Sequence, residues 1–177
     1  VCQQDVLFCT DAGLMTGTGN QTFSPDKPMT RAMLVTVLYR AAGEPTVTGI
    51  TNKFTDNKQG QYYYNAVLWA SNMGIVNGAT ATTFDPNGNV TREQIAAILY
   101  RYEGSPTVTG SLSGYPDQAQ VSSFAVTAMQ WAVGSGVLTA EKTLTPRAAA
   151  PRYNVAEFLA NFCMKVIPTA EMMPKAA

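Results

Sequence analysis

The feature that most constrains this chain is a segment that recurs 61 residues later. Residues 43–49 (GEPTVTG) return at 104–110 as GSPTVTG, with six of seven residues identical. The same offset relates several further pairs: Thr30 and Thr91, Phe23 and Phe84, Gly17 and Gly78, Phe8 and Trp69. A fixed offset of this length indicates one small supersecondary unit used repeatedly, and each unit is too small to bury a core alone.

A third, less regular copy follows the first two. Three of its landmarks keep the order seen in the second copy: the Tyr115–Asp117 loop, Trp131 and Arg152. It departs from that copy by Ala140 in place of a turn glycine and by Leu144 in place of an aromatic residue. We divide the chain into repeat 1 (1–44, without its opening loop), repeat 2 (45–105), repeat 3 (106–167) and a tail (168–177).

Each repeat is predicted to contain two helices. In repeat 2, a first helix near 62–72 ends at Gly74, a residue that accepts the left-handed backbone common after helices. A second helix opens at Thr91, and its spacing to Gln94 is that of a capping box. The second helices are apolar nearly all round, which predicts a central position. The expected fold class is mainly α, with three helix-loop-helix repeats arranged with pseudo-three-fold symmetry around a central three-helix core.

Composition and charge exclude several classes of function. Lys plus Arg and Asp plus Glu both number 12, so the chain lacks the positive balance typical of nucleic-acid or membrane-surface binding. Histidine, the commonest general base and metal ligand, is absent, and no Cys-x-x-Cys pair suggests zinc. No segment has the length of a membrane span. We expect no catalysis, no metal or cofactor, no nucleic-acid partner and no membrane insertion.

The three cysteines allow two interpretations. Cys2, Cys9 and Cys163 can be buried thiols, or Cys163 can be bridged to Cys2 or Cys9 if the two ends of the chain meet. Cys2 and Cys9 are too far apart along one helix to pair with each other.

The motifs of repeat 2, taken together, resemble the S-layer homology family. They stand in the order of the family's pattern: an aromatic-x-Asp loop (Phe54–Asp56), a helix tryptophan (Trp69), a glycine turn (Gly74–Gly78), an aromatic-x-Pro segment (Phe84–Pro86) and a helix start (Val90–Gln94). The resemblance extends to about Ile167. The chain departs from the family at the glutamate of the helix-start motif, where Met33, Gln94 and Asn154 stand.

The resemblance implies an extracellular, non-catalytic module that anchors a larger parent polypeptide to the Gram-positive cell wall. Such modules bind secondary cell-wall polysaccharide, often through a pyruvylated sugar, in grooves between repeats. Carried over by position, the glycan-binding residues are Arg31, Arg92, Arg152, Asp56, Asp117, Trp69, Trp131, Gly17 and Gly78. The alternative is a protein-protein interaction or oligomerisation module of a surface protein.

Each kind of candidate residue has a binding role and a structural one. The arginines can bind a carboxylate at a helix start, or pair with carboxylates such as Asp26 and Glu93. The tryptophans can stack on sugar rings, or anchor the core. The aspartates can accept sugar hydroxyls, or cap helices and accept hydrogen bonds in loops. The turn glycines can bring backbone close to a sugar.

Repeat 3 has changed most, so we expect binding to depend mainly on the grooves around Arg31 and Arg92. Replacing Arg92 by alanine is then expected to weaken glycan binding with little change in melting temperature. Arg40 and Arg101 lie at the C-terminal ends of the second helices, and we expect them only to keep those ends in contact with solvent.

Overall fold

A computed structural model describes residues 3–19, 22–139 and 142–166. The helices are α1 (Gln3–Asp11), α2 (Arg31–Ala41), α3 (Tyr64–Asn72), α4 (Arg92–Tyr102), α5 (Val126–Ser135) and α6 (Arg152–Lys165), with two short 3-10 turns, η1 (Gln118–Gln120) and η2 (Ser123–Ala125), before α5. Within the described residues the only strand-like pairings are isolated bridges. The predicted mainly α class is confirmed. The repeat boundaries stay predictions, and the tail lies outside the described residues.

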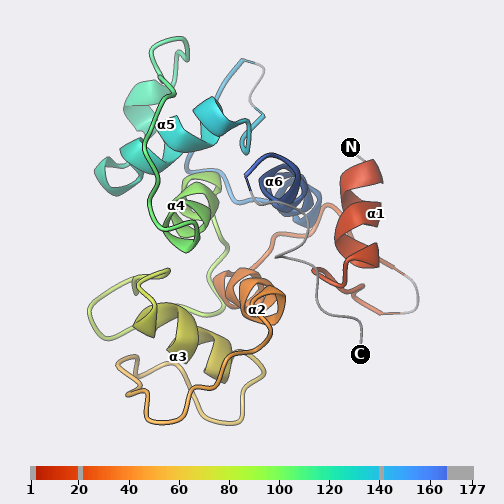
Figure 1. Cartoon of the computed structure of the whole chain (residues 1–177), viewed down its shortest axis with the longest axis vertical. Helices are drawn as coiled ribbons and strands as arrows, with labels where there is room; N and C mark the ends of the chain where they lie inside the picture. The colour runs from red at the N-terminus through yellow and green to blue at the C-terminus, as the bar shows by residue number, and fades with distance from the viewer. Residues whose placement is uncertain (1–2, 20–21, 140–141, 167–177) are drawn as a thin grey trace.

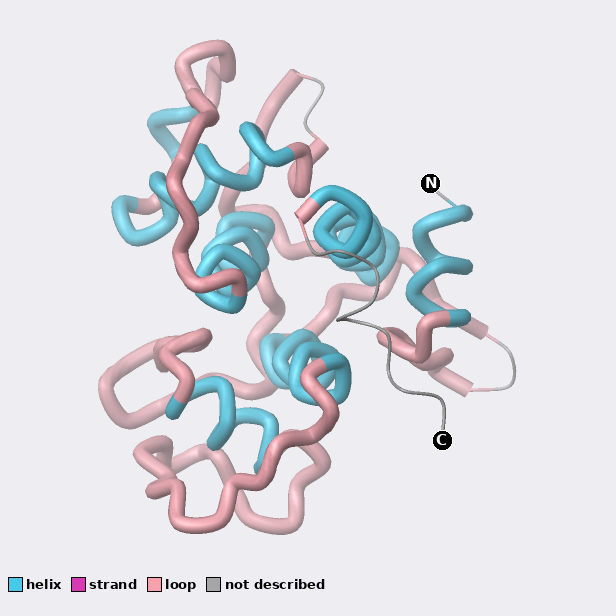
Figure 2. Tube along the Cα trace, viewed as in Figure 1, coloured by secondary structure: helices cyan, strands magenta, loops and turns pink. Residues whose placement is uncertain are grey.

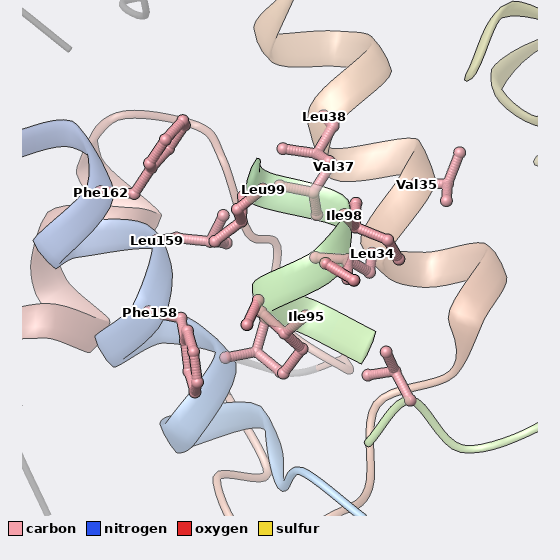
Figure 3. Packing of buried hydrophobic residues seen from close by; sticks show 14 of the residues in the cluster. Leu34, Val35, Val37, Leu38, Ile95, Ile98, Leu99, Phe158, Leu159 and Phe162 are labelled. Atoms are coloured by element: carbon pink, nitrogen blue, oxygen red, sulfur yellow. The ribbon is translucent and has the colours of Figure 1, made fainter. Parts of the chain in front are cut away.

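The second helix of each repeat lies at the centre of the molecule. Figure 1 shows α2, α4 and α6 together in the middle, with α1, α3 and α5 outside them, and Figure 2 shows long loops connecting the two layers. Leu34 and Leu38 of α2, Ile95 and Leu99 of α4, and Leu159 of α6 are fully buried (Figure 3). The central helices need apolar residues on nearly every side because they have neighbours on nearly every side.

Each central helix also packs against the first helix of the following repeat. The pairs are α2 with α3, α4 with α5, and α6 with α1. The last pair joins the two ends of the described chain, and there the Cys9 thiol donates a hydrogen bond to the carbonyl oxygen of Ala156. The three repeats therefore close into a ring.

Backbone hydrogen bonds connect the repeats in the same cyclic order, just before each central helix. The amide of Met29 donates to Ala150 (3.0 Å), that of Ala150 to Val90 (2.9 Å), and that of Val90 back to Met29 (2.9 Å). This cycle is compatible with the expected pseudo-three-fold symmetry, which itself stays a prediction.

The helix starts follow the predicted local chemistry. Thr91 accepts a hydrogen bond from the Gln94 amide, and the Gln94 side chain answers by accepting from the Thr91 amide, which confirms the capping box. Thr30 caps α2 with its hydroxyl alone, and Pro151 precedes α6 without a side-chain cap. After α3, Gly74 takes a left-handed backbone with φ of 71°.

Cys9 and Cys163 are buried thiols and do not form a disulfide with each other. Burial is the main cause that raises the pKa of Cys9 to about 12 and that of Cys163 to about 11, so both stay protonated at neutral pH. A bridge to Cys2 concerns a residue outside the described part of the chain. No helix in the described ranges has the length and apolarity needed to cross a bilayer. The same ranges contain no cluster of three His, Cys, Asp or Glu side chains that could hold a metal ion.

Candidate functional site

Arg31, at the first position of α2, reaches into the loops of repeat 2. Its Nε donates to the Phe84 carbonyl oxygen and its Nη2 to that of Asn77, both at 3.0 Å. The guanidinium lies 4.8 Å from the centroid of the Phe84 ring. Arg31 is only 7% exposed. It therefore joins two repeats, and it does so through carbonyl oxygens rather than through Asp26.

Arg152 repeats this arrangement between repeat 3 and repeat 1. Its Nε donates to the Phe23 carbonyl oxygen (2.9 Å) and its Nη2 to that of Thr16 (2.6 Å). Its guanidinium lies 4.6 Å from the Phe23 ring centroid. Thr16 and Phe23 precede Asn77 and Phe84 by the repeat offset of 61, so the two arginines make corresponding contacts.

Arg92 shares only half of this pattern. Its Nε donates to the Leu144 carbonyl oxygen at 2.9 Å, but its Nη1 donates to the Asn154 side-chain oxygen. The Asn154 amide donates in turn to the Glu157 carboxylate at 2.9 Å. The Arg92 guanidinium also lies 5.6 Å from the Phe158 ring centroid. Arg92 thus contacts a polar chain of α6, Asn154 and Glu157, in addition to the loop of repeat 3.

All three guanidiniums are partly withdrawn from water. Burial lowers the pKa of Arg31, Arg92 and Arg152 from its ordinary value, because a less polar environment disfavours the charged form. Nearby carboxylates oppose this effect at two of them, led by Asp85 at Arg31 and by Glu157 at Arg92. Arginine keeps its charge under these conditions, so each site presents a desolvated cation.

Asp56 and Asp117 hold the loops that the arginines reach. The two oxygens of Asp56 accept from the amides of Phe84 (2.8 Å) and Asp85 (2.7 Å). Asp85 has a positive φ of 59°, which is unfavourable for a residue with a side chain, and the two hydrogen bonds stabilise it. Both Asp56 oxygens are thereby engaged, which favours the loop-acceptor alternative over direct sugar binding.

Asp117 accepts the same kind of hydrogen-bond pair in repeat 3. It accepts from the amides of Leu144 (3.0 Å) and Thr145 (2.7 Å), and Thr145 has φ of 44°. Burial by itself would raise the pKa of Asp117, but these amides and the Arg92 charge outweigh it and hold the pKa below its ordinary value.

The two tryptophans belong to the core. Trp69 is 6% exposed, and its ring lies 5.6 Å from that of Tyr39 and 6.3 Å from that of Tyr102. Trp131 is 4% exposed and packs 5.6 Å from Tyr100. Neither ring presents an open face to a sugar, so the structure agrees with the core alternative for both residues.

The turn glycines are required by close backbone packing. A side chain at Gly78 would clash with the carbonyl oxygens of Thr80 and Thr83. At Gly17 the nearest atom, the Thr22 carbonyl oxygen, would lie 2.9 Å from an added Cβ. Both glycines line grooves between repeats. Ala140, the corresponding residue of repeat 3, lies outside the described residues.

The first groove, the Arg31 groove, has a volume of about 400 Å³ and is built by all three repeats. Arg31 comes from repeat 1, the Asn77–Ala79 turn and one side of α4 with Arg101 come from repeat 2, and Phe124 comes from repeat 3.

The second, the Arg152 groove, has a volume of about 450 Å³ and the same plan one repeat further round the ring. Arg152 comes from repeat 3, the Thr16–Thr18 turn and one side of α2 with Arg40 come from repeat 1, and Tyr62 comes from repeat 2. Volumes of this size accommodate small-molecule ligands such as one or two sugar rings.

Comparison with known proteins agrees with this repeat architecture. The model of the S-layer homology domain matches residues 4–32 and 53–96. The surface-layer 125 kDa protein of Lysinibacillus sphaericus is 33% identical over 162 residues, which cover 87% of this chain and 13% of that protein. This chain is a member of the S-layer homology family.

Two further relatives are an enzyme and an S-layer protein. An endoglucanase of Bacillus sp. (strain KSM-635) is 36% identical over 121 residues, covering 66% of this chain and 12% of that protein. An S-layer protein of Bacillus thuringiensis subsp. finitimus is 29% identical over 94 residues, covering 53% and 11%. The chain thus spans 11–13% of the length of these relatives. Together they support a non-catalytic S-layer homology module that anchors proteins at the cell wall or cell surface.

Eight of the nine S-layer homology candidates named from sequence fall into three groups in the structure. Arg31, Arg152, Gly17 and Gly78 line grooves; Asp56 and Asp117 hold loops; and Trp69 and Trp131 fill the core. Arg92 is bonded within the protein. The expectation that the Arg92 groove is one of the two main sites stays a prediction, because the turn expected to line it includes residues 140 and 141, which the structure does not describe.

Two arginines and two exposed aromatic residues that line the grooves were not among the sequence candidates: Arg40, Arg101, Tyr62 and Phe124. The signal for the arginines was present, since Leu38–Arg40 and Leu99–Arg101 repeat at the offset of 61, but a helix-end arginine is usually solvated. Tyr62 and Phe124 are separated by 62 residues, because of a small length difference between the repeats. Their place beside a groove follows only from the tertiary structure, because each lines a groove formed mainly by other repeats.

Proposed function

We propose that this chain anchors a larger surface protein to the cell wall by binding a secondary cell-wall polysaccharide with pyruvylated sugars in the Arg31 and Arg152 grooves. The observation that carries the proposal is the pair of corresponding grooves, each with a buried arginine, a glycine turn and walls from all three repeats. The surface-layer and cell-surface relatives supply the setting.

The chemistry of the grooves suits a sugar with one carboxylate. A pyruvate ketal adds one negative charge to a sugar, and a guanidinium binds a carboxylate through two parallel hydrogen bonds. The grooves are partly apolar, with Val76 and Ile98 in one and Met15 and Val37 in the other, which suits the apolar faces of a sugar ring. Two grooves on one chain can engage two units of the same polymer, and such bivalent binding is far stronger than either contact alone.

The carboxylates of the loops support a non-catalytic role. Glycoside hydrolysis needs two carboxyl groups facing one bond. Asp56 and Asp117 lie in different repeats, and each is engaged by two backbone amides of its own repeat. Neither is placed to act as a general acid or base with the other.

The proposal is tested by sedimentation with purified cell-wall sacculi. We expect the chain to co-sediment with intact sacculi and to stay in the supernatant after the secondary polymer has been stripped chemically. Released polymer added to intact sacculi should compete. Binding that is unchanged by stripping would point to the alternative, a module that recognises a protein or the peptidoglycan itself, and would overturn the proposal.

A further inference from the structure

A second arginine lies in each groove and has no hydrogen-bond or ion-pair partner among the described residues. Arg101 of α4 lines the Arg31 groove, and Arg40 of α2 lines the Arg152 groove. Each stands nine residues after the first arginine of its own helix. Across the described part of the chain, neither guanidinium has a hydrogen bond or ion pair, whereas Arg31 and Arg152 each donate two hydrogen bonds to carbonyl oxygens.

An exposed aromatic ring accompanies each of these arginines. Phe124 lines the Arg31 groove and is 54% exposed, and Tyr62 lines the Arg152 groove and is 60% exposed. Both come from the segment that precedes the first helix of the next repeat, α5 and α3 respectively. An aromatic side chain exposed beside a groove offers an apolar face on which a sugar ring can stack.

We infer that Arg101 with Phe124, and Arg40 with Tyr62, form the sugar-recognition pairs of the two grooves. This inference depends on the function proposed above. The aromatic ring stacks on the sugar, and the unpartnered arginine binds the pyruvate carboxylate. Arg31 and Arg152 are then positioning residues that hold the neighbouring turn in place.

Two physical points favour this division of roles. Arg31 and Arg152 have already committed Nε and Nη2 to the protein, so neither can offer that edge of the guanidinium to a carboxylate. Arg101 is half-buried, and burial lowers its pKa without a nearby carboxylate to oppose the effect. A partly desolvated cation without a counter-ion gains more from an incoming carboxylate than one already bonded.

The third central helix, α6, lacks the second arginine. In α6, Asn161 stands where α2 and α4 carry Arg40 and Arg101, and it is buried with its amide directed to Val137 and Thr139. The inference therefore assigns recognition to two grooves and not to three.

The test uses calorimetric titration of the whole chain with fragments of a pyruvylated wall polysaccharide. A second sample of the same fragments, from which mild acid has removed the pyruvate, serves as the neutral ligand. We expect the wild-type protein to bind the pyruvylated fragments at least about tenfold more tightly than the neutral ones. The double variant Arg40→Ala/Arg101→Ala should lose that preference. Phe124→Ala with Tyr62→Ala should weaken binding to both fragments.

Three controls separate binding from folding. Arg147→Ala removes one exposed arginine that lies in neither groove and should bind as wild type. Arg101→Lys should restore part of the preference that Arg101→Ala loses. All variants should keep the wild-type melting temperature within a few degrees, because these side chains make no hydrogen bond or ion pair within the described residues.

The outcomes distinguish the inference from the function on which it depends. If the wild type prefers the pyruvylated fragments and the arginine double variant does so equally, the inference is overturned and the proposed function stands. If the wild type binds neither fragment, or binds both equally, recognition of a pyruvylated glycan itself is overturned.

Discussion

Arg31 and Arg92 occupy the same position of two repeats, yet their surroundings differ. Both begin a central helix, and both donate from Nε to a carbonyl oxygen of the next repeat's loop. Beyond that bond, Arg31 borders an open groove with Arg101, whereas Arg92 meets Asn154 and, through it, Glu157. The two sites have the same first arginine, but the first is lined by Arg101 and Asp85, whereas the second contains Glu157.

The comparison shows that the surroundings of each arginine depend on the repeat into which its side chain reaches, rather than on the repeat to which it belongs. The changes in repeat 3 therefore fall on the site around Arg92, because Arg92 reaches into repeat 3. Arg152, although it belongs to repeat 3, reaches the unaltered turn of repeat 1. Among the described residues, Arg31 and Arg152 thus border grooves, whereas Arg92 contacts α6 as well as its loop.

The largest expected effect concerns a feature that both sites share, the aspartate that accepts two hydrogen bonds from loop amides. Asp117→Ala removes two hydrogen bonds from the Leu144 and Thr145 amides to a carboxylate and should lower the free energy of unfolding by about 3 kcal/mol. Asp56→Ala should have a similar effect. Urea unfolding measures both, with the exposed Asp26→Ala as the matched control. Loss of glycan binding without loss of stability would show instead that the aspartates contact ligand.

The next effect separates the two arginines. Arg31→Ala and Arg92→Ala each leave buried acceptors without a donor, so each should lower the free energy of unfolding by about 2 kcal/mol, or about 4–8 °C in Tm for a chain of this size. Only Arg31→Ala should also weaken binding to pyruvylated wall polysaccharide. This replaces the expectation from sequence that Arg92→Ala affects binding and not stability. Equal losses of affinity in the two variants would contradict the difference in binding role between the Arg31 and Arg92 sites.

A smaller effect on stability is expected when α6 is given the residues that α4 carries beside the Arg31 groove. Asn154→Gln, Glu157→Ala and Asn161→Arg together give α6 the residues that α4 has at these positions. Removing the Glu157 charge and adding an arginine should create a third binding site, with unfolding free energy changed by about 1 kcal/mol. Calorimetric stoichiometry should rise from two sites per chain towards three. A stoichiometry that stays at two would show that the backbone of repeat 3 also closes this site.

The smallest effect is a pH dependence. The pKa of Asp117 is lower in the folded protein than in the unfolded chain, so its contribution to stability is present above about pH 4, the ordinary value for aspartate, and is lost as the pH falls through the folded pKa. Urea unfolding at pH 7 and at pH 3 should therefore show a smaller loss for Asp117→Asn than for the wild type. An identical loss in both proteins would mean that Asp117 does not contribute to acid sensitivity.

Much of the local structure was predictable because its causes are local. The capping box at Thr91, the left-handed Gly74 and the central position of the second helices follow from short-range spacing and from apolar periodicity. The first helix of repeat 2 begins at Tyr64, two residues after the predicted start near residue 62, and Tyr62 lies exposed beside the Arg152 groove.

What the sequence by itself determined is the repeat, its two-helix plan, its caps and the family to which it belongs. Only the tertiary structure decided that Trp69 and Trp131 are core residues, that each arginine serves the next repeat, and that Arg40 and Arg101 face grooves. The physical reason is that these outcomes depend on contacts between different repeats, which range from 30 positions apart for Tyr39 and Trp69 to 136 for Arg152 and Thr16. Such contacts form only in the folded chain, where α2 packs against α3, α4 against α5, and α6 against α1.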